Sequence, residues 1–162
     1  MMNIELFSRL ALSPALSLLP GKMDSPPARA MIIAICLQES RLENRKQVGG
    51  PAHGFAQFEQ GGGVTGVIKH EATSEIIRGV CKSLVIPFTP TECYEAITYN
   101  DVLACCFARL LLWTLPGKLA NSYDAALGWN QYIEAWRPGK PRRESWDAYF
   151  NTAWLAIDEK EG

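Results

Sequence analysis

The chain is organised around residues 25–58, which begin with the stretch SPPARAMIIAICLQES, from Ser25 to Ser40. Ser25 is a preferred helix N-cap, and Pro26 suits the first helical position, where its missing N–H costs nothing. A helix is therefore predicted to begin at Pro26. Its apolar positions recur at helical spacing and form one stripe, made of Ala28, Met31, Ile32, Ile35 and Cys36.

The next position on this stripe is Glu39. Because a helix advances about 100° per residue, Glu39 lies within about 20° of Ala28 around the helix axis. An acid is thus placed on the face that the helix is expected to bury. Burying an unpaired carboxylate is costly, and its pKa usually rises as a result. A raised pKa is what a general acid needs near neutral pH, so Glu39 is the candidate catalytic residue. The alternative is a Glu that ends the helix and reaches solvent.

A turn-rich loop follows the predicted helix. It reads Val48-Gly49-Gly50-Pro51-Ala52-His53-Gly54 and continues as Phe55-Ala56-Gln57-Phe58. Such a loop can fold back over the helix end and form one wall of a cleft. In that wall the amide of Gln57 offers both a donor and an acceptor to a ligand. A Gln that only braces its own loop is the alternative.

Three short elements of this chain resemble those of a known enzyme family. Gln38-Glu39-Ser40, followed by Gly54-Phe55-Ala56-Gln57, is similar to the Glu-Ser and Gly-Leu-Met-Gln elements of lytic transglycosylases with a lysozyme-like fold. The later segment Ala126-Leu127-Gly128-Trp129-Asn130 resembles the Tyr-Asn-Ala-Gly region of that family, with Trp129 in the Tyr position. The elements cover a minority of the residues, but their order and separation span most of the chain.

The match departs from the family pattern in two places. Phe55-Ala56 stands where Leu-Met is usual, and Gln131-Tyr132 stands where Ala-Gly is usual. These departures favour one alternative, a lysozyme-fold binding or structural module in which Glu39 is inert.

The resemblance implies a lysozyme-like fold and cleavage of the β-1,4 bond between MurNAc and GlcNAc in peptidoglycan glycan strands. In the family one Glu suffices, here Glu39. It protonates the glycosidic oxygen and then takes the proton from the C6 hydroxyl of the sugar, which leaves a 1,6-anhydro-muramic end and consumes no water. This mechanism needs no cofactor. The residues implied to contact the substrate are Ser40, Phe55, Gln57, Trp129, Asn130 and Tyr132.

Aromatic residues add candidate saccharide contacts. All five tryptophans fall in the C-terminal half of the chain. Because aromatic faces suit stacking on sugar rings, Trp129, Tyr132 and Trp136 are candidates for such contacts. The alternative is a core position, which helical spacing favours for Trp146 and Trp154.

A hydrolase is the second enzymatic alternative. Hydrolysis of a glycoside usually needs two carboxylates, one as the acid and one as the nucleophile or base. Glu43, Glu59 and Glu71 are the nearest candidates in sequence, and none has an identifying spacing. Such an enzyme would be muramidase-like or chitinase-like.

The totals describe an ordinary globular protein. At 162 residues, with 48% apolar and 20% charged residues, the chain is expected to form one domain, 1–162. A domain of this size can form a stable core without disulfides or metals. The net charge is −1 and no basic block occurs, which argues against nucleic acid as the main partner. The oligomeric state stays open.

The cysteine and histidine content argues against disulfides and metals. Five cysteines, with Cys105 and Cys106 adjacent and no C-x-x-C pair, indicate reduced and mostly buried thiols. With only His53 and His70 available, we expect no metal site.

The N-terminal stretch does not read as a secretion signal. Residues 1–19 hold one basic residue, Arg9, and no small-residue cleavage site follows an apolar run. No apolar run approaches the roughly 18 residues of a membrane span, so no stable membrane insertion is expected. We therefore expect synthesis in the cytoplasm and action on the periplasmic cell wall after release or delivery. By analogy alone, a small enzyme of this kind resembles a bacteriophage lysis or tail protein.

The expected fold class is mainly α, with one central buried helix and room for a short β ribbon near 54–58. The central helix is 101–115, which is apolar nearly all round. A short first helix is expected to end before Pro14, with an apolar connector at 16–19. The other expected helices are 76–84, one capped by Thr89, 122–132, and a last one whose apolar face holds Trp146, Tyr149, Phe150, Ala153, Trp154 and Ile157.

Overall fold

The computed structural model describes residues 2–161, so Met1 and Gly162, the two ends of the predicted domain, lie outside the described residues. The described chain is mainly helical, as predicted. Its elements in order are α1 (Ile4–Phe7), the π-helical turn η1 (Ser8–Leu12), α2 (Ser13–Leu18), the 3₁₀ turn η2 (Gly21–Met23), α3 (Pro26–Ser40), the π-helical turn η3 (Gln60–Val64), α4 (Thr65–Lys69), α5 (Ser74–Leu84), α6 (Pro90–Ile97), α7 (Asp101–Trp113), α8 (Ala125–Trp136) and α9 (Arg143–Glu161).

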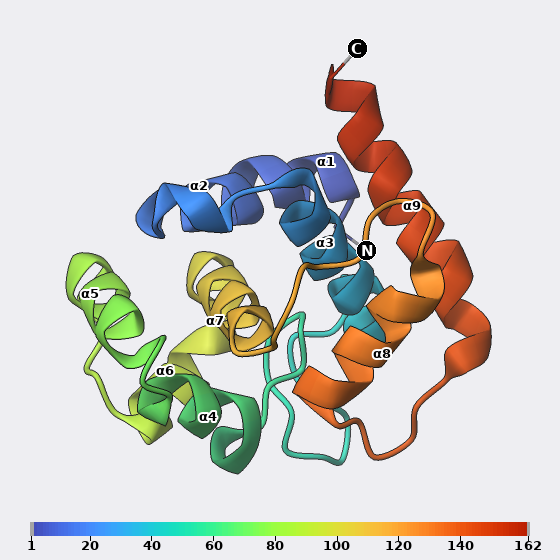
Figure 1. Cartoon of the computed structure of the whole chain (residues 1–162). Helices are drawn as coiled ribbons and strands as arrows, with labels where there is room; N and C mark the ends of the chain where they lie inside the picture. The colour runs from blue at the N-terminus through green and yellow to red at the C-terminus, as the bar shows by residue number, and fades with distance from the viewer. Residues whose placement is uncertain (1, 162) are drawn as a thin grey trace.

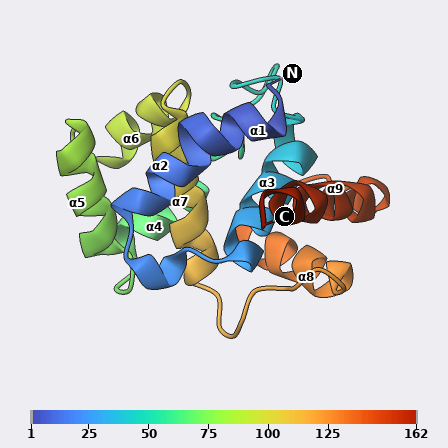
Figure 2. The same cartoon turned by 90° about the horizontal axis from the view of Figure 1, so that it is seen from above.

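The helices form two groups. In Figure 1, α3, α8 and α9 lie on the right and α4 to α7 on the left, and Figure 2 shows α7 between α5 and α3. The loop 41–59 joins the groups. The Arg45 guanidinium in this loop pairs with Asp101 at the start of α7 at 2.9 Å. On the other side, the indole Nε1–H of Trp136 in α8 donates to the Ala56 carbonyl at 2.8 Å.

Helix α3 begins as predicted. The Ser25 hydroxyl accepts a hydrogen bond from the Ala28 N–H at 3.2 Å, with Pro26 at the first helical position. The helix ends at Arg41, which adopts a left-handed conformation with φ of 54°. The predicted apolar stripe is buried, but burial is not confined to it, because α9 and α7 pack against α3 and other positions of the helix are buried as well. The additional buried positions are Ala30, Ile33, Ala34 and Leu37.

Helix α7 is the predicted central buried helix. All its residues from Leu103 to Leu112 are buried, including its one internal charge, Arg109. The Asn100 side chain caps its start by accepting from the Leu103 N–H at 3.0 Å. Burial lowers the pKa of Arg109 to about 10, and its Nε–H donates to the Met23 carbonyl at 2.7 Å. The fold thus has two buried helices, α3 and α7, where one was predicted.

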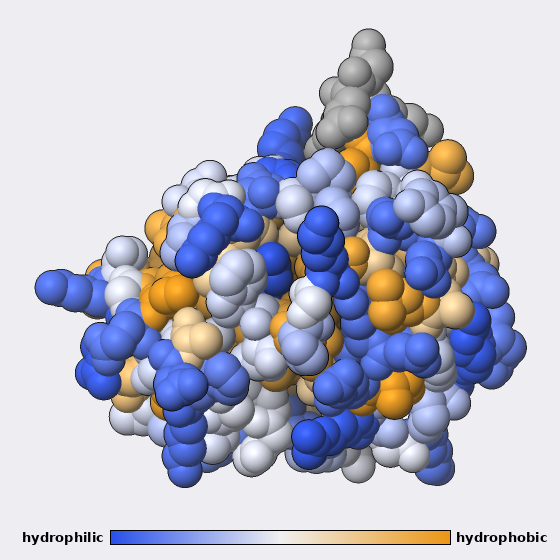
Figure 3. Space-filling view, viewed as in Figure 1, coloured by the Kyte–Doolittle hydropathy of each residue, from blue (hydrophilic) through white to orange (hydrophobic). Residues whose placement is uncertain are grey.

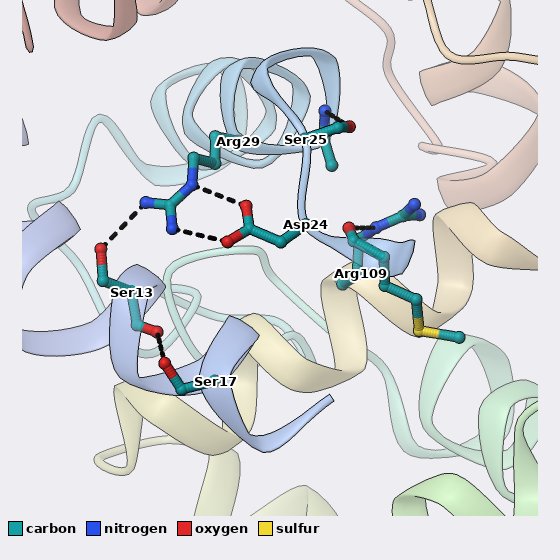
Figure 4. Close-up of polar contacts among 8 residues, drawn as sticks. Ser13, Ser17, Asp24, Ser25, Arg29 and Arg109 are labelled. Carbon is teal, nitrogen blue, oxygen red and sulfur yellow. Dashed lines mark hydrogen bonds and ion pairs between the residues drawn. The ribbon is translucent and has the colours of Figure 1, made fainter. Parts of the chain in front are cut away.

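Polar contacts fasten the connector between α2 and α3 (Figure 4). The Arg29 guanidinium forms two hydrogen bonds with the Asp24 carboxylate, at 2.8 and 2.9 Å. Its third contact is with the Ser13 hydroxyl at 2.9 Å. With the Arg109 bond to the Met23 carbonyl, these contacts tie the start of α3 to α2 and α7.

The N-terminal prediction is wrong at Pro14. The helix does not end there but continues through the π-helical turn Ser8–Leu12 into α2, and the expected connector is helical as far as Leu18. In the wider turn the Ser13 N–H bonds to the Ser8 carbonyl. The π turn changes the pattern of backbone hydrogen bonds just before Pro14. In a regular α-helix, Pro14 would lack the N–H for its hydrogen bond, and its ring would clash with a carbonyl of the preceding turn.

The predicted ribbon is reduced to two isolated bridges, and the described residues contain no strand. The bridges join His53 to Lys46 and to Phe58. Between His53 and Phe58 the backbone turns through Gly54 and Gln57, with φ of 78° and 53°. This tight turn leaves no room for an extended ladder. Helix α8 also differs from its prediction, since Asp124 caps it by accepting from the Leu127 N–H at 3.0 Å and it runs on to Trp136.

All five cysteines lie in the described part of the chain, where they are buried and unpaired. The sulfurs of Cys81 and Cys93 lie 3.6 Å apart, within hydrogen-bonding distance of each other.

The molecular surface is mostly hydrophilic on the face seen in Figure 3, where hydrophobic residues form separate patches. Among the described helices, none alone has the length and hydropathy to cross a membrane. Helices α6 and α7, bent by 118° at their break, reach these thresholds only as a pair.

Candidate active site

A cleft of about 800 Å³ lies where the last turn of α3 meets the loop 47–63, the end of α8 and the segment 137–142. Glu39 and Tyr132 line it from the two helices, and Gln57 lines it from the loop. A second groove, of about 1030 Å³, lies between α1 and α9 and has a more apolar lining. We assign the candidate site to the cleft because the acidic, amide and aromatic side chains converge there.

Glu39 lies in the last turn of α3, partly buried in the cleft. Its carboxylate accepts a hydrogen bond from the Tyr132 hydroxyl. Burial raises the pKa of Glu39, while the Tyr132 hydrogen bond and the charge of Arg142 oppose this rise and the charge of Glu59 adds to it. The net effect is a raised pKa, which favours the protonated acid at higher pH than for an exposed Glu.

One wall of the cleft is fastened to α3 through Gln38. The Gln38 amide donates to the Arg142 carbonyl at 2.8 Å and accepts from the Ser145 hydroxyl at 2.8 Å. In return the Arg142 guanidinium donates to the Gln38 carbonyl at 3.0 Å. These bonds join residues about a hundred positions apart in sequence and hold the segment 137–142 beside Glu39.

The opposite wall is the loop that carries Gln57. The Gln57 amide donates to the Gly54 carbonyl at 2.8 Å, so it braces its own loop while it lines the cleft. A side chain at Gly54 would be strained, because a Cβ there would lie 2.7 Å from Ile97 Cγ2 and 3.0 Å from the Ile97 carbonyl oxygen. Gly54 therefore sets how closely this loop approaches α6.

Aromatic side chains form part of the cleft surface. Trp136 and Phe58 both line it, with ring centroids 5.7 Å apart. The ring centroids of Tyr132 and Trp136 are 6.3 Å apart. Tyr132, Ala135 and Trp136 share one face of α8 at helical spacing. Such a surface suits the apolar face of a sugar ring.

One of the three candidate second carboxylates lies in this cleft. Glu59 is an exposed residue of the lining. Glu43 lines the other groove, between α1 and α9, and Glu71 lies in the turn before α5. The cleft therefore holds two carboxylates, Glu39 and Glu59.

The structure brings together four of the eight predicted site residues, Glu39, Gln57, Tyr132 and Trp136. Ser40 and Phe55 do not line the cleft. The Ser40 hydroxyl is buried, donates to the Phe55 carbonyl at 2.7 Å and accepts from the Leu42 N–H at 3.2 Å. Phe55 is only 2% exposed. Both residues hold the loop onto the end of α3.

Trp129 and Asn130 also lie outside the cleft lining. Trp129 is one turn before Tyr132 and packs against Trp146, with ring centroids 5.9 Å apart. Asn130 is exposed, and two helical positions turn it about 200° from Tyr132. The departure at Tyr132 from the family pattern thus marks the residue of this region that contacts Glu39.

The segment 137–142 is the part of the site that was not predicted. Arg137, Lys140 and Arg142 line the cleft together with Pro138, Gly139 and Pro141. The sequence signal that could have indicated this segment is a basic, proline-rich turn directly after a helix that carries aromatic residues. Among the described residues, no group of three or more His, Cys, Asp or Glu side chains could hold a metal ion.

Comparisons with protein-family profiles, with curated proteins and with solved structures gave no match to this chain.

Proposed function

We propose that this protein is a lytic transglycosylase that cleaves the β-1,4 bond between MurNAc and GlcNAc in peptidoglycan, with Glu39 as its single catalytic acid and base. The observation that carries the proposal is a carboxyl group with a raised pKa, partly buried at the end of a central helix and facing a cleft. We further propose that the helical arrangement is lysozyme-like. The buried helix α3, which carries Glu39 in its last turn and is followed by a loop over its end, supports this assignment.

The proposed reaction balances on one carboxyl group. Protonated Glu39 gives its proton to the glycosidic oxygen as the bond from C1 to that oxygen breaks. The C6 hydroxyl of the same sugar then attacks C1, and its proton returns to the Glu39 carboxylate. The products are a 1,6-anhydro end and a free hydroxyl on the leaving sugar, with no net use of water and no cofactor.

Neighbouring groups support both states of this acid. Burial favours the protonated state that starts the reaction, and the Tyr132 hydroxyl stabilises the carboxylate that forms when the proton leaves. We propose that the Gln57 amide holds hydroxyl or N-acetyl groups of the substrate and that Trp136 stacks on a sugar ring. Ser40, Phe55, Trp129 and Asn130 have no direct substrate contact in this proposal.

We propose that the enzyme acts in the periplasm on the cell wall, after release or delivery from the cytoplasm, as in phage lysis or cell-wall penetration. This part of the proposal rests on the resemblance alone.

A hydrolase is the second candidate, and Glu59 is the observation that favours it. Glu59 lines the same cleft as Glu39 and its charge contributes to the raised pKa of Glu39. In a muramidase, Glu59 would activate a water or act as the nucleophile.

Mass spectrometry of peptidoglycan digests separates these functions. The proposal predicts anhydro ends, which are lighter by one water than reducing ends. Glu59→Gln is expected to keep the anhydro product, whereas a hydrolase would give reducing ends and lose them in that variant. A digest without new ends would contradict both enzymatic functions and leave a non-catalytic module.

A further inference from the structure

One wall of the cleft carries a cluster of positive charge. Arg137, Lys140 and Arg142 lie within six residues and all line the cleft, where their side chains are exposed. In the described part of the chain, none of the three takes part in an ion pair. They are therefore available to a ligand in the cleft. We call Arg137, Lys140 and Arg142 the basic wall.

One member of the basic wall, Arg142, is held in place before any ligand binds. Pro138 and Pro141 restrict the backbone on either side of Lys140. Two hydrogen bonds with Gln38, at 2.8 and 3.0 Å, fix Arg142 against the last turn of α3. A preformed charged surface loses less conformational entropy on binding than a flexible one.

The charge of the cleft differs from that of the whole chain. The net charge of the protein is −1, but the cleft sets three cations against the carboxylates of Glu39 and Glu59. When Glu39 is protonated, as its role as an acid requires, Glu59 is the one charged carboxylate in the described lining. The cleft then carries a net positive charge that favours an anionic ligand.

The position of Arg142 places this charge next to the reacting bond. Arg142 is bonded to Gln38, the residue before Glu39, and its charge acts on Glu39 directly. A group that contacts the basic wall is therefore carried by a sugar close to the bond that Glu39 cleaves. In the proposed substrate that sugar is muramic acid, whose lactyl ether ends in a free carboxylate wherever the glycan strand carries no stem peptide; where a stem is attached, this carboxyl group is an uncharged amide.

We infer that the basic wall binds the free lactyl carboxylate of peptide-free glycan strands beside the scissile bond. The enzyme would therefore favour these strands over strands whose lactyl group is an amide and over neutral glycans such as chitin. This inference rests on the proposed function. Guanidinium and ammonium groups form charge-assisted hydrogen bonds with carboxylates, which are stronger than those with neutral groups. Nucleic acid is the less favoured ligand, because binding a phosphate backbone takes a larger cluster of Lys and Arg than these three residues, and the net charge of the chain is −1.

Binding measurements on the catalytically silent Glu39→Gln variant test the inference without turnover. The ligands are a peptide-free GlcNAc-MurNAc tetrasaccharide with free lactyl carboxylates, the same tetrasaccharide with its carboxylates amidated, and chitotetraose. We expect the free acid to bind roughly tenfold more tightly than either neutral ligand at low salt. Added salt should reduce this preference, because it screens exposed charges.

A matched pair of variants assigns the preference to the basic wall. Arg137→Gln with Lys140→Gln, on the same background, should reduce the preference, with Arg142 retaining part of it, and leave the affinity for chitotetraose unchanged. The control, Lys69→Gln with Lys82→Gln, removes two exposed charges from α4 and α5 and should keep the preference. Thermal unfolding of both double variants checks that they are folded.

Three results would overturn the inference: equal binding of the acid and amide forms, a preference that is undiminished in the Arg137 and Lys140 variant, or tighter binding of a single-stranded DNA tetranucleotide than of the acid tetrasaccharide. The proposed function is tested separately by the wild-type digest. If the digest gives anhydro products but binding shows no preference for the carboxylate, only the inference about the basic wall is wrong. If binding shows the preference but the digest gives no anhydro products, the proposed transglycosylase function is wrong.

Discussion

The hydroxyl of Tyr132 donates a hydrogen bond to the carboxylate of Glu39, and this bond joins the cleft face of α8 to the last turn of α3. The two residues are 93 positions apart in sequence. Burial and the Glu39 charge raise the pKa of Tyr132, so the phenol stays protonated and remains a donor. The neutral Tyr132 hydroxyl therefore stabilises the ionised Glu39 carboxylate by a hydrogen bond, without adding an opposite charge.

Tyr132→Phe is expected to shift the alkaline limb of the pH profile of peptidoglycan cleavage to higher pH. The lost hydrogen bond stabilises the charged form of Glu39, so its removal raises the pKa of Glu39 further. The measurement is the initial rate of cleavage against pH. Tyr123→Phe, on the exposed turn before α8, is the control and should leave the limb in place. An alkaline limb that is unmoved or shifted down in Tyr132→Phe would show that the bond does not tune this acid.

Glu39→Gln is expected to become more stable relative to the wild type as the pH rises. Because the folded state raises the pKa of Glu39, it binds more protons than the unfolded state above the ordinary pKa of a Glu. Wild-type stability therefore falls as the pH rises from the unfolded pKa through the folded one, and the variant lacks this loss. Urea unfolding of both proteins at pH 4 and pH 8 measures the difference. A difference that is constant or shrinks with pH would contradict the burial of this acid.

Gly54→Ala is expected to destabilise the protein by about 2–4 kcal/mol, from the left-handed backbone and the overpacking of the new methyl group. Gly54 has φ of 78°, and a Cβ would lie 2.7 Å from Ile97 Cγ2. Gly66→Ala in α4 is the matched control. A Cβ there meets nothing within 4 Å, so the change should be neutral or stabilise by about 0.5–1 kcal/mol. Urea unfolding compares the two, and equal effects would argue against the packing of the loop on α6.

Ser40→Ala is expected to cost about 1–3 kcal/mol of stability, because it leaves the buried Phe55 carbonyl and Leu42 N–H without this partner. The hydroxyl lies 2.7 Å from that carbonyl and outside the cleft lining. The KM for peptidoglycan fragments should therefore stay within about twofold at a temperature where the variant is folded, because Ser40 touches no substrate. A raised KM with unchanged stability would restore Ser40 as a substrate contact.

Local signals account for the parts of the fold that the sequence predicts. The N-caps Ser25 and Thr89 accept hydrogen bonds from backbone N–H groups at 3.2 and 3.1 Å, as their residue types and the following prolines indicate. The length and hydropathy of 101–115 likewise predict α7. These features depend on neighbours in sequence, so they can be derived without tertiary structure.

The failures have tertiary causes. Proline rules predict an end before Pro14, but a π-helical turn lets the helix continue while the core holds both halves. The basic wall was missed because its position depends on the bonds between Gln38 and Arg142, which are 104 positions apart. Within the motif, the residue types of Ser40 and Phe55 do not reveal that their contact is made through a backbone carbonyl.

The central claim is that Glu39 is the catalytic acid, and the most direct test is peptidoglycan turnover by Glu39→Gln together with thermal unfolding of the same preparation. Gln keeps the size of the side chain and can accept the Tyr132 hydrogen bond, but it can neither give nor take back a proton. We expect a folded protein, at least as stable as the wild type near neutral pH, that releases no anhydro-muropeptides. Turnover near the wild-type level in a folded Glu39→Gln variant would contradict the account.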